Sequence, residues 1–130
     1  MSHSANERPI DFRIFKDLGM PEILVAAGDT ILAEGGKGAI MFVVKSGTAN
    51  VLVNGIFVEQ ISEGGIFGEM ALLNNSPRSA DIVAETDVSV IPVDETKFIA
   101  LIAKVPHFSL LVMRSLARRI RKMNAMLGAR

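Results

Sequence analysis

The residues best suited to chemistry lie within one segment, residues 63–80, which reads EGGIFGEMALLNNSPRSA. Glu69–Leu73 is predicted to form a short helix directly after Gly68, a residue whose backbone reaches conformations closed to other residues. The first turn of such a helix presents unpaired N–H groups and the positive end of its dipole, which attract an anion. Asn74–Pro77 is predicted to reverse the chain and return Arg78, whose planar guanidinium suits a singly charged phosphate.

Glu69 and Arg78 together indicate a particular kind of ligand. A carboxylate beside a phosphate is unfavourable unless it accepts a hydrogen bond from a hydroxyl and is balanced by a cation such as Arg78. A ribose hydroxyl is such a donor. The pair therefore favours a ligand with a phosphate and a sugar hydroxyl close together. Taken alone, Glu69 is as compatible with a carboxylate that only stabilises a helix start as with a ligand contact. Taken alone, Arg78 is as compatible with an ordinary surface arginine.

The composition argues against most other kinds of site. The 130 residues include 0 Cys and 2 His, so a thiolate nucleophile, a zinc site and a histidine-based triad are not expected. The 14 Lys and Arg balance the 14 Asp and Glu. The basic residues near the C-terminus are interpreted as a solvated helix face, so nucleic-acid binding is not expected. No segment has the pattern of a signal peptide or a membrane span, which predicts a cytoplasmic protein without membrane insertion.

The elements that must position residues 63–80 are mostly β-strands. Short β-rich runs separated by Gly, Asn and Pro occupy the chain from Glu22 to Val93. Asn54-Gly55 is typical of a two-residue type I′ turn, because both central positions of that turn need a positive φ. The predicted strands are Ile23–Val25, Thr30–Ala33, Ile40–Lys45, Thr48–Val53, Ile56–Ile61, Asp81–Ala84 and Val88–Val93.

Helices are predicted on both sides of these strands. Ile10–Leu18 follows a polar tail over residues 1–9, and Asp94 is a suitable N-cap for a helix through Ala103. A longer helix is predicted from His107 to about Leu127, with an apolar stripe on one face. The stripe consists of Leu110, Met113, Leu116, Ala117, Ile120 and Leu127. The fold class is therefore mainly β with flanking helices, a β-roll or jelly roll in one domain over residues 10–130.

The segment 68–80 also carries a resemblance to a known family. Gly68-Glu69-Met70-Ala71-Leu72-Leu73 followed by Pro77-Arg78-Ser79-Ala80 resembles the phosphate-binding cassette of cyclic nucleotide-binding domains. Such domains occur in the catabolite activator protein, protein kinase A regulatory subunits and cyclic-nucleotide-gated channels. The resemblance extends from about Gly28 to Met123, and it includes the Asn54-Gly55 hairpin and the two closing helices.

The resemblance implies a role for each cassette residue. Glu69 would bind the ribose 2′-hydroxyl, and the backbone of Gly68 and Met70 would lie against the sugar and phosphate. Arg78 would pair with the cyclic phosphate. Ser79-Ala80 would donate hydroxyl and backbone N–H groups to the same phosphate.

The resemblance further implies an apolar base pocket and a lid. The positions that match the base pocket are Val51, Val58, Ile61 and Phe67. In the family, a side chain from the last helix closes over the base. The local candidates, which spacing does not separate, are Arg118, Arg119, Lys122 and Met123, and we include Arg119 among the site residues.

Ser79 favours cAMP over cGMP as the ligand, because a Thr at this position is associated with cGMP in the family. Three features depart from the family pattern. Gly38-Ala39 stands where many members have an acidic residue, and Asp81 stands where Thr is common. The N-terminal helical segment is shorter than usual. The carboxylate of Asp81 is expected to weaken phosphate binding if it lies near the phosphate.

The sequence thus predicts a regulatory sensor that binds a cyclic nucleotide and has no catalytic residues, metal or cofactor. Its C-terminal helix would close over the ligand, and a protein partner or a second copy would use the Leu110–Leu127 stripe. An alternative is a domain that has lost nucleotide binding and serves as a protein-interaction scaffold. A rolled metalloenzyme of the cupin type would need clustered His and Glu ligands, which this sequence lacks.

Overall fold

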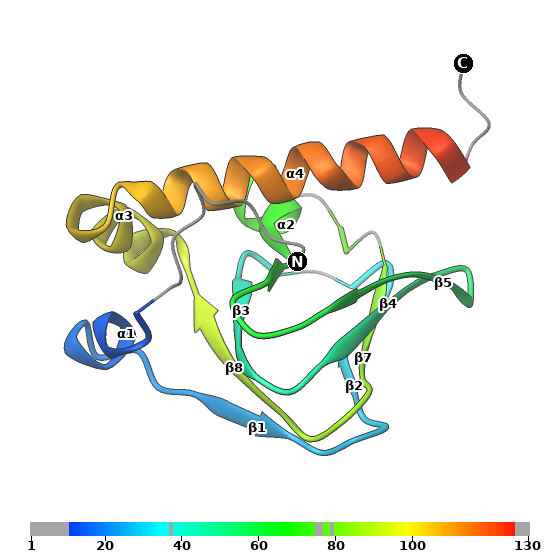
Figure 1. The fold of residues 1–130 in the computed structure, drawn as a ribbon, viewed down its shortest axis with the longest axis horizontal. Coiled ribbons are helices and arrows are strands. Elements are labelled where there is room, and N and C mark those ends of the chain that lie inside the picture. Colours follow the sequence, from blue (N-terminus) through cyan, green and yellow to red (C-terminus); the bar gives the residue numbers. More distant parts are fainter. Residues whose placement is uncertain (1–10, 37, 75–76, 79, 127–130) are drawn as a thin grey trace, which may run out of the picture.

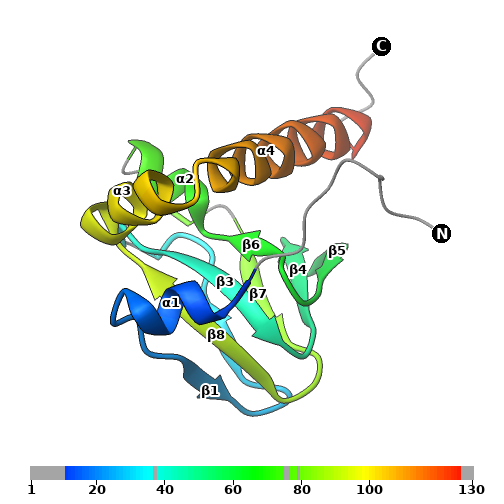
Figure 2. The same cartoon turned by 60° about the vertical axis from the view of Figure 1, so that its left-hand side comes forward.

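The computed structural model describes residues 11–36, 38–74, 77–78 and 80–126. Two four-stranded antiparallel sheets form a roll, with strand orders β1-β8-β3-β6 and β2-β7-β4-β5. Helices α2, α3 and α4 gather on one side of this roll, and α4 lies along it in both views (Figures 1 and 2). The predicted mainly β roll with flanking helices is confirmed.

The strands lie close to the positions predicted from the sequence. They are β1 Ile23–Val25, β2 Thr30–Leu32, β3 Met41–Ser46, β4 Ala49–Val53, β5 Ile56–Ile61, β6 Ile66–Phe67, β7 Asp81–Ala84 and β8 Val88–Val93. Strand β6 alone was not predicted, because two residues are too few to show alternation. Asn54 and Gly55 have φ values of 52° and 76° and join β4 to β5 with Val53 opposite Ile56, so the predicted hairpin is confirmed.

Four helices complete the described chain: α1 Arg13–Asp17, α2 Glu69–Asn74, α3 Glu95–Lys104 and α4 His107–Met126. The predicted cap is present, since the Asp94 carboxylate accepts a hydrogen bond of 2.8 Å from the Lys97 N–H. Helix α1 ends before Gly19, whose φ of +70° is left-handed.

Two apolar clusters divide the interior. One lies between the two sheets and includes Val44, Val51 and Phe67. The other lies between the sheet that contains β3 and the helices, and it includes Met41 and Phe108. Strand β3 supplies alternate residues to both clusters, because successive side chains of a strand point to opposite faces. Helix α4 is thereby held over the sheet that contains β3 and β6. Because β6 leads directly into the segment 68–80, α4 lies close to that segment.

Of the apolar stripe predicted on α4, Leu116 is half-buried and packs against the cluster between the sheet and the helices, whereas most of the other members do not pack against the roll. Leu110, Met113 and Ile120 are exposed, whereas the buried side of the helix is formed by Phe108, Val112 and Ser115. Apart from Leu116, the described part of the stripe therefore faces outward, and Arg119 points toward the roll with the buried side. Leu127, the last residue of the predicted stripe, lies outside the described residues.

Candidate functional site

A small cavity lies where the segment 68–80 meets the β-roll and α4. Its volume is about 70 Å³. It is lined by Leu32, Val51, Phe67, Gly68, Glu69, Met70, Ala71, Pro77, Arg78, Ala80, Ile82 and Arg119. Ligand sites in proteins enclose about 300–1,000 Å³. The cavity is thus too small for a nucleotide while α4 stays where it is.

Arg78 lies in this cavity with only 8% of its surface exposed. Its Nη1 donates to the Gly68 carbonyl at 3.1 Å and its Nη2 to the Ile40 carbonyl at 2.9 Å. Within the described parts of the chain, no carboxylate forms an ion pair with Arg78. Neutral carbonyls hold the group in place, and no carboxylate of the described residues is paired with its positive charge, which suits it to bind an anion.

Two glycines make room for this guanidinium. A Cβ added at Gly38 would lie 2.8 Å from the Arg78 Nη2, and one added at Gly68 would lie 2.9 Å from Nη1. Gly68 also has a φ of +81°, which other residues rarely adopt. Gly38 therefore lets Arg78 pack directly against the backbone of the loop between β2 and β3.

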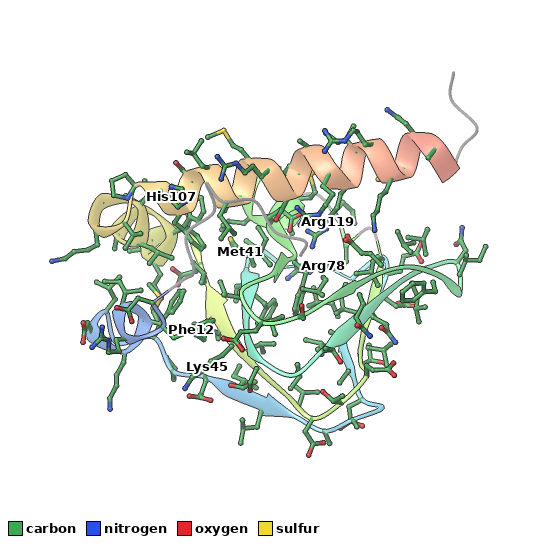
Figure 3. All side chains as sticks on the ribbon, viewed as in Figure 1. Phe12, Met41, Lys45, Arg78, His107 and Arg119 are labelled. Atoms are coloured by element: carbon green, nitrogen blue, oxygen red, sulfur yellow. The ribbon has the colours of Figure 1, made fainter. Side chains whose placement is uncertain are left out.

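Glu69, the first residue of α2, is held by Arg119 from α4. The Arg119 Nη1 lies 2.6 Å from both carboxylate oxygens of Glu69, and Glu69 is only 3% exposed. The Nε of the same arginine donates to Glu59 at 2.7 Å, and Nη2 donates to the Ile66 carbonyl. One guanidinium thus joins α4 to β5, β6 and α2. Figure 3 shows Arg119 and Arg78 close together beneath α4.

The two arginines differ in their electrostatic surroundings. Burial lowers the pKa of Arg78, and the charge of Glu69 offsets only part of that effect. Burial also acts to lower the pKa of Arg119, but the carboxylates of Glu69 and Glu59 outweigh it, so this pKa is raised above its ordinary value. Arg119 therefore sits in a negative environment and is already neutralised, whereas Arg78 sits in a desolvated one and lacks a direct counter-charge.

The residues predicted for the base pocket separate into two groups. Val51 and Phe67 line the cavity, and Phe67 is stacked on Phe42 with ring centroids 5.2 Å apart. Val58 packs against the cluster between the sheets, and Ile61 is a buried member of that cluster, but neither lines the cavity. The apolar wall contains two residues that the sequence analysis did not name, Leu32 and Ile82.

The remaining cassette residues are placed as follows. Met70 and Ala80 line the cavity together with Gly68. Ser79 lies outside the described residues. The carboxylate of Asp81 accepts a hydrogen bond of 2.6 Å from the Glu34 N–H and does not line the cavity. The Asp81 carboxylate is thus occupied at the β2–β3 loop.

Glu59, which was not predicted from the sequence, supports Arg119 from β5. Glu59 is 7% exposed, and the Lys122 Nζ lies 3.8 Å from its second carboxylate oxygen. Strand alternation places Glu59 on the same face as Ile61, a face expected to be apolar. A carboxylate on that face indicates a buried partner, and this was the sequence feature that could have identified Glu59. Among the four lid candidates, Arg119 is the one that reaches the cavity.

Over the described ranges, no group of three or more acidic or histidine side chains could hold a metal ion. The helices in those ranges also lack the combined length and apolar character needed to cross a membrane.

Comparison with known proteins gives a family match that covers most of the cavity residues. The profile of the Cyclic nucleotide-binding domain matches residues 22–105. A cAMP-dependent protein kinase regulatory subunit from Dictyostelium discoideum is 43% identical over 76 residues, which are 55% of this chain and 23% of that protein. The chain thus spans about a quarter of the length of this curated relative.

Two solved structures show the same arrangement of elements. A structure described as Sp-2Cl-cAMPS bound to a PKAR domain is 27% identical, with a TM-score of 0.71, and the match covers 85% of this chain and 73% of that one. The catabolite activator protein of Thermus thermophilus is 28% identical, with a TM-score of 0.70, over 87% of this chain and 57% of that one.

Proposed function

Because this chain belongs to the cyclic nucleotide-binding domain family, we propose that it binds cAMP, in preference to cGMP, in the cavity beneath α4. The observation that carries the proposal is Arg78, a buried cation without a paired carboxylate in the described chain, in the same cavity as the Glu69 carboxylate. The domain would act as a regulatory module rather than as an enzyme.

The ligand is placed by the two charged residues. The cyclic phosphate would bind the Arg78 guanidinium, with further donors from Ser79 and Ala80. The ribose 2′-hydroxyl would donate to Glu69, and the backbone of Gly68 and Met70 would lie against the sugar. The base would lie on the apolar wall, whose residues in the cavity are Leu32, Val51, Phe67 and Ile82.

Arg119 would then compete with the ribose 2′-hydroxyl for the Glu69 carboxylate. Both oxygens of that carboxylate lie 2.6 Å from the Arg119 Nη1, so the ribose hydroxyl must take a position that the arginine now holds. The cavity of about 70 Å³ must also enlarge to admit a nucleotide. Ligand binding would therefore release Arg119 and shift α4, and α4 would close again over the base with a different set of contacts. This change in α4 is the proposed signal.

The alternative is a domain in which Arg119 permanently fills the cavity and the fold serves as a protein-interaction scaffold. The cluster of Glu59, Glu69, Arg119 and Lys122 favours it, since its two carboxylates and two cations already balance without a ligand. The two proposals differ in whether cAMP binds at all.

Calorimetric titration of cAMP and cGMP into the wild type and Arg78→Ala tests the proposal. We expect cAMP to bind more tightly than cGMP, and Arg78→Ala to weaken cAMP binding about 30- to 1000-fold, because a desolvated charged contact contributes about 2–4 kcal/mol. Arg121→Ala, which removes an exposed arginine of α4, is the matched control and should bind normally. No heat and no thermal shift with the wild type would favour the scaffold.

A further inference from the structure

The outward face of α4 carries a continuous apolar line. Leu110, Met113 and Ile120 are 42%, 55% and 58% exposed, and Ala117 lies exposed between them. Steps of three, four and three residues place these side chains on one line along the helix. In Figure 2, no described element lies on the side of α4 that faces away from the roll. The spacing is that of a seam against which a second helix packs.

A row of basic residues runs beside this line. The sequence of α4, HFSLLVMRSLARRIRKMNAM, contains five Arg and Lys and no Asp or Glu. Arg119 and Lys122 are engaged by Glu59 and Glu69. The ion pairs found in the described part of the chain do not include Arg114, Arg118 or Arg121. Arg114 and Arg121 follow Met113 and Ile120 directly, so their charges border the apolar line on one side.

The charges indicate which occupant suits this face. A second copy of the chain would bring an equally basic helix against the first, and like charges across an interface are unfavourable. An anionic membrane surface is attracted by basic helices, but such helices insert a broad apolar face, often with Trp or Phe. Here the line is narrow and lacks aromatic residues. A helix with acidic residues beside its own apolar line would complement both features.

We propose that α4 is a docking surface for an acidic amphipathic helix of a partner protein. The partner's apolar residues would pack against Leu110, Met113, Ala117 and Ile120, and its carboxylates would lie beside Arg114 and Arg121. Arg114 and Arg121 border the apolar line on one side only. The partner's carboxylates would therefore have to lie on that same side of the line. The proposal does not rest on nucleotide binding.

The test uses two fluorescent synthetic helices of about three heptads, with Leu along one line and either Glu or Lys at the flanking positions. Fluorescence anisotropy with the full chain, in the absence of nucleotide, should show the Glu peptide binding about tenfold or more tightly than the Lys peptide. Ile120→Ser should weaken Glu-peptide binding. Arg114→Glu combined with Arg121→Glu should reverse the preference, and all three side chains are exposed, so folding should be retained, as checked by circular dichroism.

Four results would overturn the proposal. They are failure of the Glu peptide to bind, equal binding of both peptides, dimerisation of the chain alone that Ile120→Ser abolishes, and binding to anionic phosphatidylserine vesicles that Ile120→Ser abolishes. The third would assign the face to a second copy, and the fourth to a membrane surface.

Discussion

Arg119 of α4 and Glu69 of α2 are separated by 50 residues in the sequence, yet the arginine Nη1 lies 2.6 Å from both carboxylate oxygens. Glu69 is the residue expected to hold the ribose, so the same carboxylate ties down the C-terminal helix and is offered to the ligand. In the proposed function, nucleotide binding and helix position would therefore be linked through one group, and each would affect the other to the same extent.

This link predicts that Arg119→Gln binds cAMP more tightly than the wild type, by about tenfold, because the competitor for Glu69 is removed. The same change should lower the free energy of unfolding by about 2–4 kcal/mol, since two buried carboxylates lose their partner. Titration calorimetry and thermal unfolding measure the two effects. Arg118→Gln, an exposed neighbour on α4, should change neither. A substantial loss of cAMP affinity in Arg119→Gln would instead make Arg119 a cap on the base.

Glu69 should determine the preference for a 2′-hydroxyl. The wild type is expected to bind cAMP about 10- to 100-fold more tightly than 2′-deoxy-cAMP, because a hydrogen bond to a charged acceptor contributes about 1.5–3 kcal/mol. Glu69→Gln should lose most of that preference. Competition binding with the two nucleotides measures it, and equal preference in the wild type and the variant would contradict the assigned role of Glu69.

Gly38 should be required for the position of Arg78 rather than for the fold. A Cβ at this position would lie 2.8 Å from the Arg78 Nη2, and the φ of Gly38 is not left-handed. Gly38→Ala should therefore displace the guanidinium and weaken cAMP binding about tenfold with little change in Tm. Normal cAMP affinity in a folded Gly38→Ala variant would show that Arg78 tolerates the displacement.

Acid sensitivity should arise in part at Glu22, far from the cavity. Its carboxylate accepts hydrogen bonds from the Lys45 Nζ at 2.6 Å and the Ser89 Oγ at 2.5 Å. Both bonds lower the pKa of Glu22 from 4.5, and the bond from Lys45 has the larger effect. A lowered folded-state pKa stabilises the protein above pH 4.5, and the contribution is lost as the pH falls through the lowered value. The Tm difference between the wild type and Glu22→Gln should shrink over that range. A constant difference would exclude the contribution.

The local features of the fold could be predicted because short-range chemistry determines them. The Asn54-Gly55 turn and the Asp94 cap depend on neighbouring residues alone, and both are present as predicted. The outward direction of the α4 stripe could not be predicted in this way. An amphipathic pattern gives the angular position of apolar residues, whereas the face that packs is chosen by the shape of the roll and by the buried contacts of Arg119.

The site itself was predictable in part. The pattern of residues 68–80 identified Glu69 and Arg78, and the structure brings both to one cavity. Glu59 was not found because it is a single carboxylate in a strand, and its role depends on a helix 60 residues away. Pairing between elements so distant in the sequence leaves no periodic signal.

The most direct test of the account is a crystal structure of the protein with saturating cAMP. We expect the phosphate on Arg78, the ribose 2′-hydroxyl on Glu69, and Arg119 displaced from the Glu69 carboxylate with α4 moved. A nucleotide bound in this cavity while the Arg119 Nη1 stays within 2.6 Å of Glu69 would contradict the competition between ligand and helix. A nucleotide bound elsewhere would contradict the site.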